Sequence, residues 1–402
     1  MRKLLTIVLC LALLISVTTL AATDRASNKT YLKMMDVQEL WNEQRYTEAL
    51  GVLREYEPKM ARDPYDHAIV LQYIAHTYVF LDQIDGAREA LQKALQLPDI
   101  GVPLTADLNL VYGQIVLSDD RFVEGRDAIE YWYANTESLK QPGQIFTLAY
   151  ANFMTERMER AEELLAIAIA AESSPKESWY RLYYQALFEQ KKYAEAEEVL
   201  FGMIARKPYE NDNWRLLANH HMQLEDSRQA VAAITIAYNA GLLEGADDLK
   251  RMIALYSVIE APEKAARLLD KHLADETIEA DSESLKRLAD LWLMSRERPQ
   301  ARAALRKAAA VAPDGRTYEM LGNIYFEDEA WKEAHDAYLR AIDLGGLDEP
   351  ERIYLLAGMS AAEAGMKGEA RAAFREARRS EKLRGQADAL MRRLDRKPPQ
   401  PN

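Results

Sequence analysis

Cysteine is almost absent from the chain, which has a single copy at position 10. Cys10 lies in an N-terminal apolar stretch that we expect to be removed, and Leu9 before it is not the small residue that a lipoprotein signal requires. The mature chain would then have no thiol, which excludes disulfide bonds, thiol catalysis and metal sites built on cysteine. Its stability must come from packing alone.

Linkers and excess positive charge are absent as well. The 402 residues exceed the size of a usual single core, yet no stretch rich in proline, glycine or serine and no block of charge divides them. This favours a quasi-one-dimensional architecture. The formal net charge is −13, and it becomes about two units more negative without Arg2 and Lys3, which disfavours binding to nucleic acid or anionic lipid.

Motifs for catalysis, phosphate binding and metal binding are also missing. The sequence has no histidine pair with the spacing of a zinc protease, no glycine-rich phosphate loop, no calcium loop and no nucleophile elbow. His220 and His221 are adjacent, but neighbouring helix residues point about 100° apart and cannot easily share one tetrahedral ion. We therefore predict no enzyme, no cofactor, no metal site and no small-molecule substrate.

The N-terminus has the pattern of a secretory signal. Met1-Arg2-Lys3 precedes an apolar run from Leu4 to Leu20, which ends at Ala21 and Ala22. We expect a signal peptide over residues 1–21, cleaved after Ala21 or Ala22, and a mature protein in the periplasm that is at most peripheral to the membrane. The alternative is a retained anchor, since the run approaches the roughly 17–25 residues of a spanning helix. Interrupting polar residues favour cleavage: Thr6, Ser16, Thr18 and Thr19.

The strongest signal in the chain is internal repetition. A small residue recurs ten times at steps of 33 to 38 residues, and a bulky apolar residue follows each of them four positions later, on the same helical face. The small residues are Ala49, Ala87, Gly125, Ala161, Ala196, Ala230, Ala265, Ala301, Ala334 and Ala370.

Each of these short helices is preceded by a partner helix with its own signature. Near the C-terminus Tyr318, Leu321, Gly322 and Tyr325 precede Ala334, and the same offsets recur upstream. The pattern resembles the tetratricopeptide repeat, in about ten degenerate copies over residues 30–384. The resemblance implies an all-α, right-handed superhelical solenoid of helix-turn-helix repeats, in which small residues at the eighth and twentieth positions let the paired helices approach closely.

The C-terminal end departs from the repeat. Residues 381–395 are predicted to form a polar helix, and its residues 385–395, beyond the repeat array, are predicted to cap the last repeat. Residues 396–402 are predicted to be disordered from their composition.

In tetratricopeptide proteins the first helix of each pair lines a groove, chiefly at its second, fifth, ninth and twelfth positions. Here the fifth position is basic in four successive repeats, and amides occupy the ninth position in two of them. We predict a partner-binding groove that receives an acidic extended segment. The alternative is that these cations pair with local Glu or Asp. The residues are Arg181, Arg215, Lys250, Lys286, Gln185 and Asn219.

Some related co-chaperone repeats clamp a terminal carboxylate with lysine, arginine and asparagine at fixed positions. Arg215 and Asn219 match part of that pattern, but the next repeats have Arg251 in place of Asn and Glu283 with Arg287. The clamp is incomplete, so recognition of a free C-terminus is not expected.

Upstream, the groove positions become apolar and aromatic. This would suit an apolar peptide or a helix, or the side chains could complete the stacking core. The groove residues predicted here are Gln114, Phe146, Tyr150 and Phe153.

Three stretches resemble a narrower group, the periplasmic tetratricopeptide component of TonB systems. They span residues 237–243, 341–347 and 354–359, and the likeness is best after Trp214. It implies a non-enzymatic scaffold that assists a TonB-ExbB-ExbD system in outer-membrane transport, typically of iron chelates, with TonB, ExbB, ExbD or other envelope proteins as partners. The alternative is a repeat scaffold for envelope assembly or export, in polysaccharide, secretion or pilus machinery.

Overall fold

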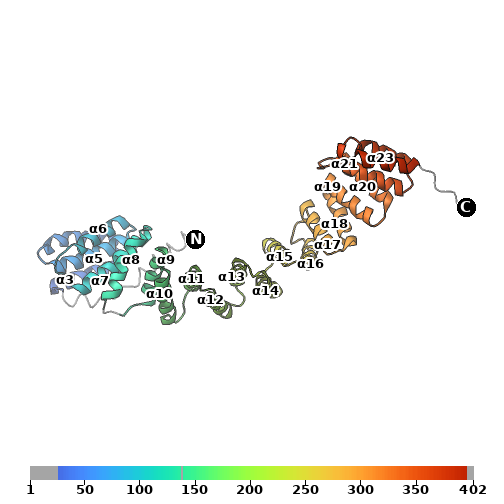
Figure 1. Cartoon of the computed structure of the whole chain (residues 1–402). Helices are drawn as coiled ribbons and strands as arrows, with labels where there is room; N and C mark the ends of the chain where they lie inside the picture. Colours follow the sequence, from blue (N-terminus) through green and yellow to red (C-terminus); the bar gives the residue numbers. More distant parts are fainter. Residues whose placement is uncertain (1–25, 137–138, 396–402) are drawn as a thin grey trace. The chain divides into compact units, whose positions relative to one another are not determined.

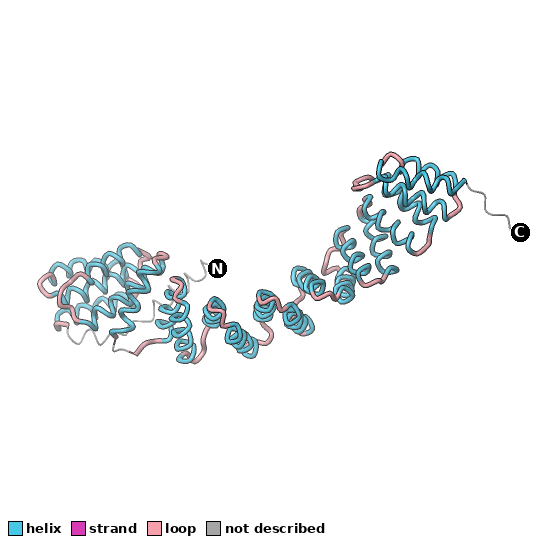
Figure 2. Tube along the Cα trace, viewed as in Figure 1, coloured by secondary structure: helices cyan, strands magenta, loops and turns pink. Residues whose placement is uncertain are grey.

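The computed structural model describes residues 26–136 and 139–395, and within them every regular element is a helix (Figure 2). The predicted signal peptide (1–21) and the predicted disordered tail (396–402) lie outside these residues. Contacts divide the chain into two compact units, residues 1–206 and 207–402. Each unit is a row of short helices joined by tight turns.

The first unit begins with α3 and ends with α12 (Figure 1). Its helices are α3 (Asn28–Asn42), α4 (Tyr46–Tyr56), the 3-10 helix η1 (Glu57–Met60), α5 (Pro64–Phe80), α6 (Ile84–Leu95), α7 (Val102–Ser118), α8 (Phe122–Asn135), α9 (Pro142–Met154), α10 (Met158–Ala171), α11 (Glu177–Glu189) and α12 (Tyr193–Arg206).

The second unit begins with α13 and ends with α23. Its helices are α13 (Asn211–Gln223), α14 (Ser227–Asn239), α15 (Ala246–Val258), α16 (Pro262–Ala274), α17 (Ser282–Met294), α18 (Arg298–Val311), α19 (Gly315–Glu327), α20 (Trp331–Leu344), α21 (Pro350–Glu363), α22 (Lys367–Ala377) and α23 (Glu381–Asp395).

The helices pair as the sequence period predicts. Each odd-numbered helix from α3 to α21 packs against the even-numbered helix that follows it, and within a unit each pair packs against the next. The described residues therefore contain ten pairs, and the predicted all-α solenoid of about ten helix-turn-helix repeats is confirmed. We refer to the odd-numbered member of each pair as the first helix and to the other as the second helix.

Close approach of the paired helices depends on their small residues. A Cβ atom on Gly113 of α7 would lie 2.5 Å from a side-chain carbon of Ile129 in α8. On Gly322 of α19 it would lie 2.6 Å from the ring of Tyr338 in α20. Real Cβ contacts are never so short, so these positions exclude larger side chains, as the repeat pattern implies.

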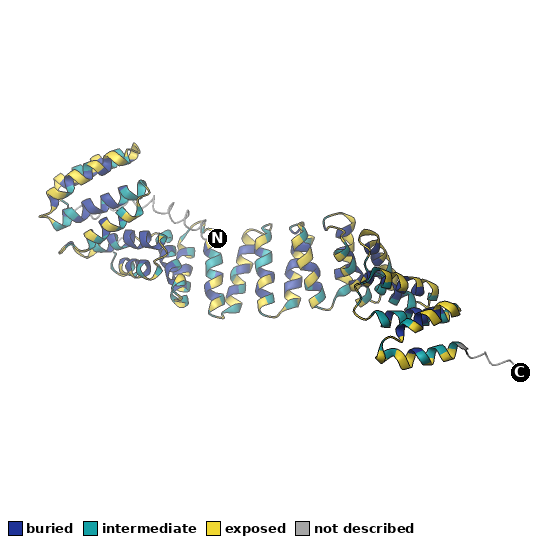
Figure 3. Cartoon of the chain, turned by 90° about the horizontal axis from the view of Figure 1, so that it is seen from above, coloured by how far each residue is buried: buried dark blue, intermediate teal, exposed yellow. Residues whose placement is uncertain are grey.

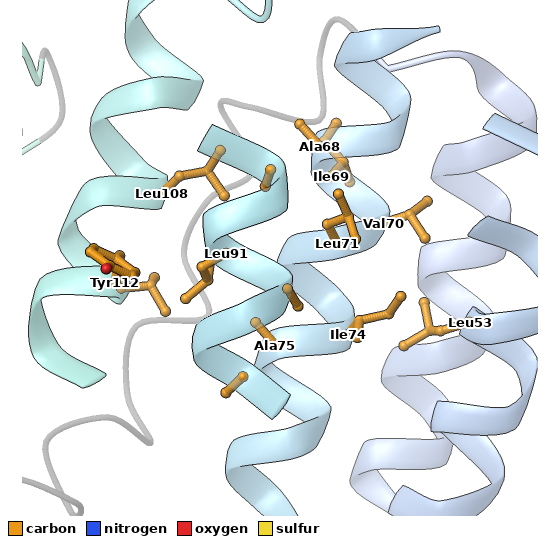
Figure 4. Packing of buried hydrophobic residues seen from close by; sticks show 14 of the residues in the cluster. Leu53, Ala68, Ile69, Val70, Leu71, Ile74, Ala75, Leu91, Leu108 and Tyr112 are labelled. Atoms are coloured by element: carbon orange, nitrogen blue, oxygen red, sulfur yellow. The ribbon is translucent and has the colours of Figure 1, made fainter. Parts of the chain in front are cut away.

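The core is continuous between neighbouring helices. Figure 4 shows side chains of α4, α5, α6 and α7, among them Leu53, Ile74, Leu91 and Leu108, that fill the spaces between these helices. Individual helices bury one side and expose the other (Figure 3). No single pair could cover its apolar face alone, so each repeat stabilises its neighbours.

The turn between the two helices of each pair has one fixed feature, a residue with positive φ. In nine of the ten pairs this residue is not glycine, and the next backbone N–H bonds to a carbonyl five residues earlier, for example Glu297 to Trp292 at 2.8 Å. This is the Schellman geometry that ends a helix. The ten residues are Gln44, Asp82, Asp120, Glu156, Lys191, Glu225, Glu260, Arg296, Glu329 and Gly365.

The last helix, α23, packs against α21 and α22. Leu383, Leu390 and Leu394 cover the apolar cluster around Phe374. The helix covers Glu381–Asp395, the range over which the sequence predicts a polar helix, and the Ser380 carbonyl accepts the Arg384 N–H at 3.0 Å.

Candidate partner-binding site

Three of the four predicted groove cations occupy equivalent places in the second unit. Arg215, Lys250 and Lys286 lie at the fifth position of the first helices α13, α15 and α17. The fourth, Arg181, belongs to α11 of the first unit, where it pairs with Glu177 one turn earlier at 2.8 Å. The structure therefore brings together three of the predicted cations in one unit.

Each of these three cations faces an aspartate at the start of the next first helix. The Arg215 guanidinium donates to Asp248 at 2.5 Å, and the Lys286 ammonium donates to Asp314 at 3.2 Å. The bond to Asp248 raises the pKa of Arg215. Arg215 also pairs with Asp212 on its own helix at 3.1 Å, as the alternative of local pairing predicts, whereas Asp248 and Asp314 belong to the next repeat. The role of these cations toward a partner stays a prediction.

These aspartates have a local reason to be there. Asp281 and Asp314 are the N-caps of α17 and α19, and they accept the backbone N–H of Ser284 at 2.7 Å and of Thr317 at 2.8 Å. A carboxylate at a helix N-terminus satisfies free N–H groups and the helix dipole. The bond from Ser284, together with the charge of Lys250, lowers the pKa of Asp281.

The two amides at the ninth position, Gln185 of α11 and Asn219 of α13, are exposed. Their side chains are accessible to a partner, as a groove role requires. Gln185 lies in the first unit and Asn219 in the second.

The aromatic groove residues of the first unit are partly buried against its core. Phe146 of α9 stacks on Trp179 of α11 with ring centroids 4.8 Å apart, and Tyr150 meets Phe122 edge to face at 6.1 Å. Phe153 packs on the same apolar cluster. These contacts match the alternative in which the side chains complete the stacking core, and a groove role stays a prediction.

Gln114 of α7 is 6% exposed. On the same helix, at the second position, burial raises the pKa of Asp107 to about 6. Burial also lowers the pKa of His76 on α5 to about 4, so its ring is neutral at pH 7. Gln114 is thus largely covered by its neighbours, and its role in a groove stays a prediction.

Two pockets lie where the first helices of the second unit follow one another. The α13–α15 pocket measures about 390 Å³ and the α15–α17 pocket about 170 Å³. The α13–α15 pocket is lined by Arg215, Gly245, Ala246, Asp247, Asp248 and Arg251. The α15–α17 pocket is lined by Lys250, Ile253, Leu269, Ile278, Asp281, Glu283, Ser284 and Arg287.

The two pockets are built from equivalent positions of successive repeats. Each combines the fifth residue of one first helix with the second, third and sixth residues of the next. The sixth residues, Arg251 and Arg287, are exposed and make no ion pair or side-chain hydrogen bond with any described residue. The sequence analysis noted these two arginines only because they depart from the pattern of the carboxylate clamp. Both occupy the sixth position of successive first helices, and this regularity could have identified them from the sequence.

The described residues hold no group of three or more histidine, cysteine, aspartate or glutamate side chains placed to hold a metal ion. His220 and His221 are both buried, with ring centroids 5.5 Å apart. None of the helices between residues 26 and 395 combines the length and apolar character needed to cross a membrane.

Comparison with known proteins finds no matching family and no matching curated protein. Solved structures similar to the chain include the MamA protein (22% identity, 43% of this chain and 92% of that chain, TM-score 0.34). A tetratricopeptide-repeat-containing protein from Cytophaga hutchinsonii has 16% identity over 69% of this chain and 95% of its own, with TM-score 0.37.

The Cut9-Hcn1 hetero-tetramer of the APC/C is similar over 91% of this chain and 84% of that chain, with 15% identity and TM-score 0.30. At these scores the likenesses carry no inference about function. The assignment of the fold rests on the ten helix pairs.

Proposed function

We propose that this protein is a non-enzymatic scaffold that binds an extended segment of a partner protein along the first helices of its second unit. The observation that carries the proposal is the recurrence of one pocket in successive repeats. Equivalent pockets along a row of helices suit a ligand that presents equivalent groups at regular intervals along its length. An extended polypeptide is such a ligand, because its backbone has the same groups at every residue.

We further propose that the mature protein works in the periplasm as an accessory of a TonB-ExbB-ExbD system that supports outer-membrane transport of iron chelates. The N-terminal pattern of a charged start, an apolar run and small residues supports the location. The three stretches between residues 237 and 359 that resemble TonB-system components support the choice of machinery.

Two of those stretches contain turn glycines with positive φ, Gly241 at 71° and Gly345 at 75°. The first and third stretches contain the buried residues Leu243 and Leu355. These residues shape the repeats and their junctions, so the choice of machinery depends on the resemblance and needs a direct test.

The test is crosslinking in living cells under iron limitation, followed by mass spectrometry of proteins bound covalently to the mature chain. Crosslinks to TonB, ExbB or ExbD support the proposal. Crosslinks to export or assembly proteins instead would support the scaffold function but contradict the role in a TonB-ExbB-ExbD system. Fractionation and N-terminal sequencing test the location: a chain that starts at residue 22 or 23 in the periplasmic fraction is expected, and an intact N-terminus in the membrane fraction contradicts it.

A further inference from the structure

We propose that the α13–α15 and α15–α17 pockets receive two successive acidic side chains of one extended partner segment, with Arg251 and Arg287 as the residues that bind the carboxylates. This inference rests on the proposed scaffold function and adds the chemistry of the ligand and the residues that recognise it. It replaces the predicted fifth-position cations with the sixth-position arginines as the main anion contacts.

The charges inside each pocket divide into satisfied and free groups. In the α13–α15 pocket, Asp248 is held by Arg215, so neither charge is available to a ligand without breaking that bond. In the α15–α17 pocket, Asp281 accepts the backbone N–H of Ser284. Three cations that line the pockets make no ion pair or hydrogen bond with a described residue: Arg251, Arg287 and Lys250. The charge of Lys250 acts on Asp281 and lowers the pKa of that carboxyl, which leaves the two guanidinium groups as the main contacts for a ligand. A carboxylate that accepts two parallel N–H bonds matches a guanidinium group best.

A competing acid precedes each arginine by one helical turn. Asp247 lies four residues before Arg251, and Glu283 lies four residues before Arg287. Neither acid forms an ion pair with its arginine in the structure, although both line the pockets. Exposed pairs of this spacing are weak. A ligand carboxylate therefore does not have to break an ion pair to reach either arginine.

The wall of the α15–α17 pocket adds an apolar contact. Ile253, Leu269 and Ile278 line it and are between 1% and 3% exposed. This surface suits the methylene groups of a glutamate side chain whose carboxylate reaches Arg287. A free inorganic anion would gain nothing from it, which favours a peptide side chain.

The spacing of the pockets sets the spacing of the acids. We take the separation of the two pockets to be roughly 10 Å, the upper end of the distance between neighbouring helices. A polyproline II segment advances about 9 Å in one turn of three residues and presents the same face again. Two acidic residues three positions apart therefore match the two pockets. The pattern ends after α17, because the sixth position of α19 is Met320.

The experiment measures binding of a fluorescein-labelled synthetic peptide to the mature full-length chain by fluorescence anisotropy. The peptide has two glutamates three positions apart in a background of proline, threonine and serine, and its C-terminus is amidated. We expect Arg251→Gln and Arg287→Gln each to weaken binding about tenfold, the loss of one charge-assisted contact. Arg306→Gln, an exposed arginine of α18 outside both pockets, is the matched control and should change binding less than twofold.

Removal of the acids next to the two arginines should increase the affinity for the peptide. If the arginines had only a structural role, no such increase would be expected. We expect Asp247→Ala and Glu283→Ala to tighten binding about twofold each, because each removes a nearby negative charge that weakly repels the ligand carboxylate. Three results would each overturn the inference. A peptide with glutamine in place of both glutamates could bind equally well, or a peptide with the two glutamates adjacent could do so. The third is an unchanged affinity of the original peptide for the Arg251→Gln and Arg287→Gln variants. Crosslinking in cells tests the scaffold separately, so a failure of the peptide experiment leaves that result standing.

Discussion

Replacing Arg296 with glycine should stabilise the second unit. Arg296 is the turn residue between α17 and α18, with φ of 63°. Its side chain is exposed and makes no ion pair with a described residue. A side chain in this left-handed region costs roughly 1–2 kcal/mol, and glycine removes that cost but adds about 0.5–1 kcal/mol of backbone entropy to the unfolded chain. The net expectation is a gain of about 0.5–1 kcal/mol in the free energy of unfolding.

The matched control is Arg306→Gly, which makes the same chemical change ten residues later inside α18. Arg306 is also exposed, but it lies in a helix, where glycine should cost roughly 0.5–1 kcal/mol relative to arginine. Urea unfolding followed by far-UV circular dichroism measures both variants. Opposite signs are expected.

The same change at Glu225 and Glu260, with φ of 61° and 55°, tests whether the gains add. Distant sites usually do so. The triple variant with Arg296→Gly should gain about 2 kcal/mol, which corresponds to roughly 4–8 °C in Tm for a unit of this size. A loss of stability in Arg296→Gly equal to that in Arg306→Gly would refute the reasoning, because it would mean that the turn geometry carries no strain.

Three further predictions concern burial and packing. Burial raises the pKa of Asp107 to about 6 in the folded state, so ionisation of this carboxyl opposes folding above that pH. Asp107→Asn should therefore raise the free energy of unfolding of the first unit by about 1–3 kcal/mol at pH 7. In urea titrations, the difference between variant and wild type should vanish below about pH 4, where the carboxyl is protonated in both states. Gly322→Ala places a Cβ atom 2.6 Å from the ring of Tyr338 and should cost about 1–3 kcal/mol in thermal unfolding. Asp248→Ala should cost about 1–2 kcal/mol, because it removes the shorter of the two ion pairs of the partly buried Arg215 guanidinium and leaves only the pair with Asp212 at 3.1 Å. Asp247→Ala breaks no contact and should stay within about 0.5 kcal/mol in the same assay.

The repeat architecture could be predicted because its physical requirement is visible in the sequence. Helices that cross closely need small residues at fixed positions, and glycine or alanine at the eighth and twentieth positions recurs along the whole chain. Gly113, Gly322 and Gly358 sit where the structure leaves no space for a Cβ atom. Ten pairs follow from ten such positions without any three-dimensional information.

The turns between the two helices of each pair were harder to predict from the sequence. Nine of ten left-handed turn residues are polar or charged residues with a Cβ atom, held by the helix-ending hydrogen bonds around them. The hydrogen bonds that end the first helix therefore hold these residues in a conformation that their side chains disfavour.

The candidate site could be predicted only in part. The fifth-position cations were visible as a pattern, but the aspartates that pair with Arg215 and Lys286 lie 33 and 28 residues away, at the start of the next first helix. Asp314 caps that helix, whereas Asp248 lies within its first turn. The unpaired arginines at the sixth position could be recognised only after those pairs were known. Charge patterns along one helix do not reveal which charges a neighbouring repeat already satisfies.

The most direct test of the binding account is site-specific photo-crosslinking in living cells, with the photoreactive residue at Ala246, which lines the α13–α15 pocket. The account predicts a covalent adduct with a segment of an envelope protein that carries two acidic residues three positions apart. It also predicts loss of that adduct in the Arg251→Gln, Arg287→Gln double variant and its retention in Arg306→Gln. An adduct with a segment without acidic residues, or one that survives the double variant unchanged, would contradict it.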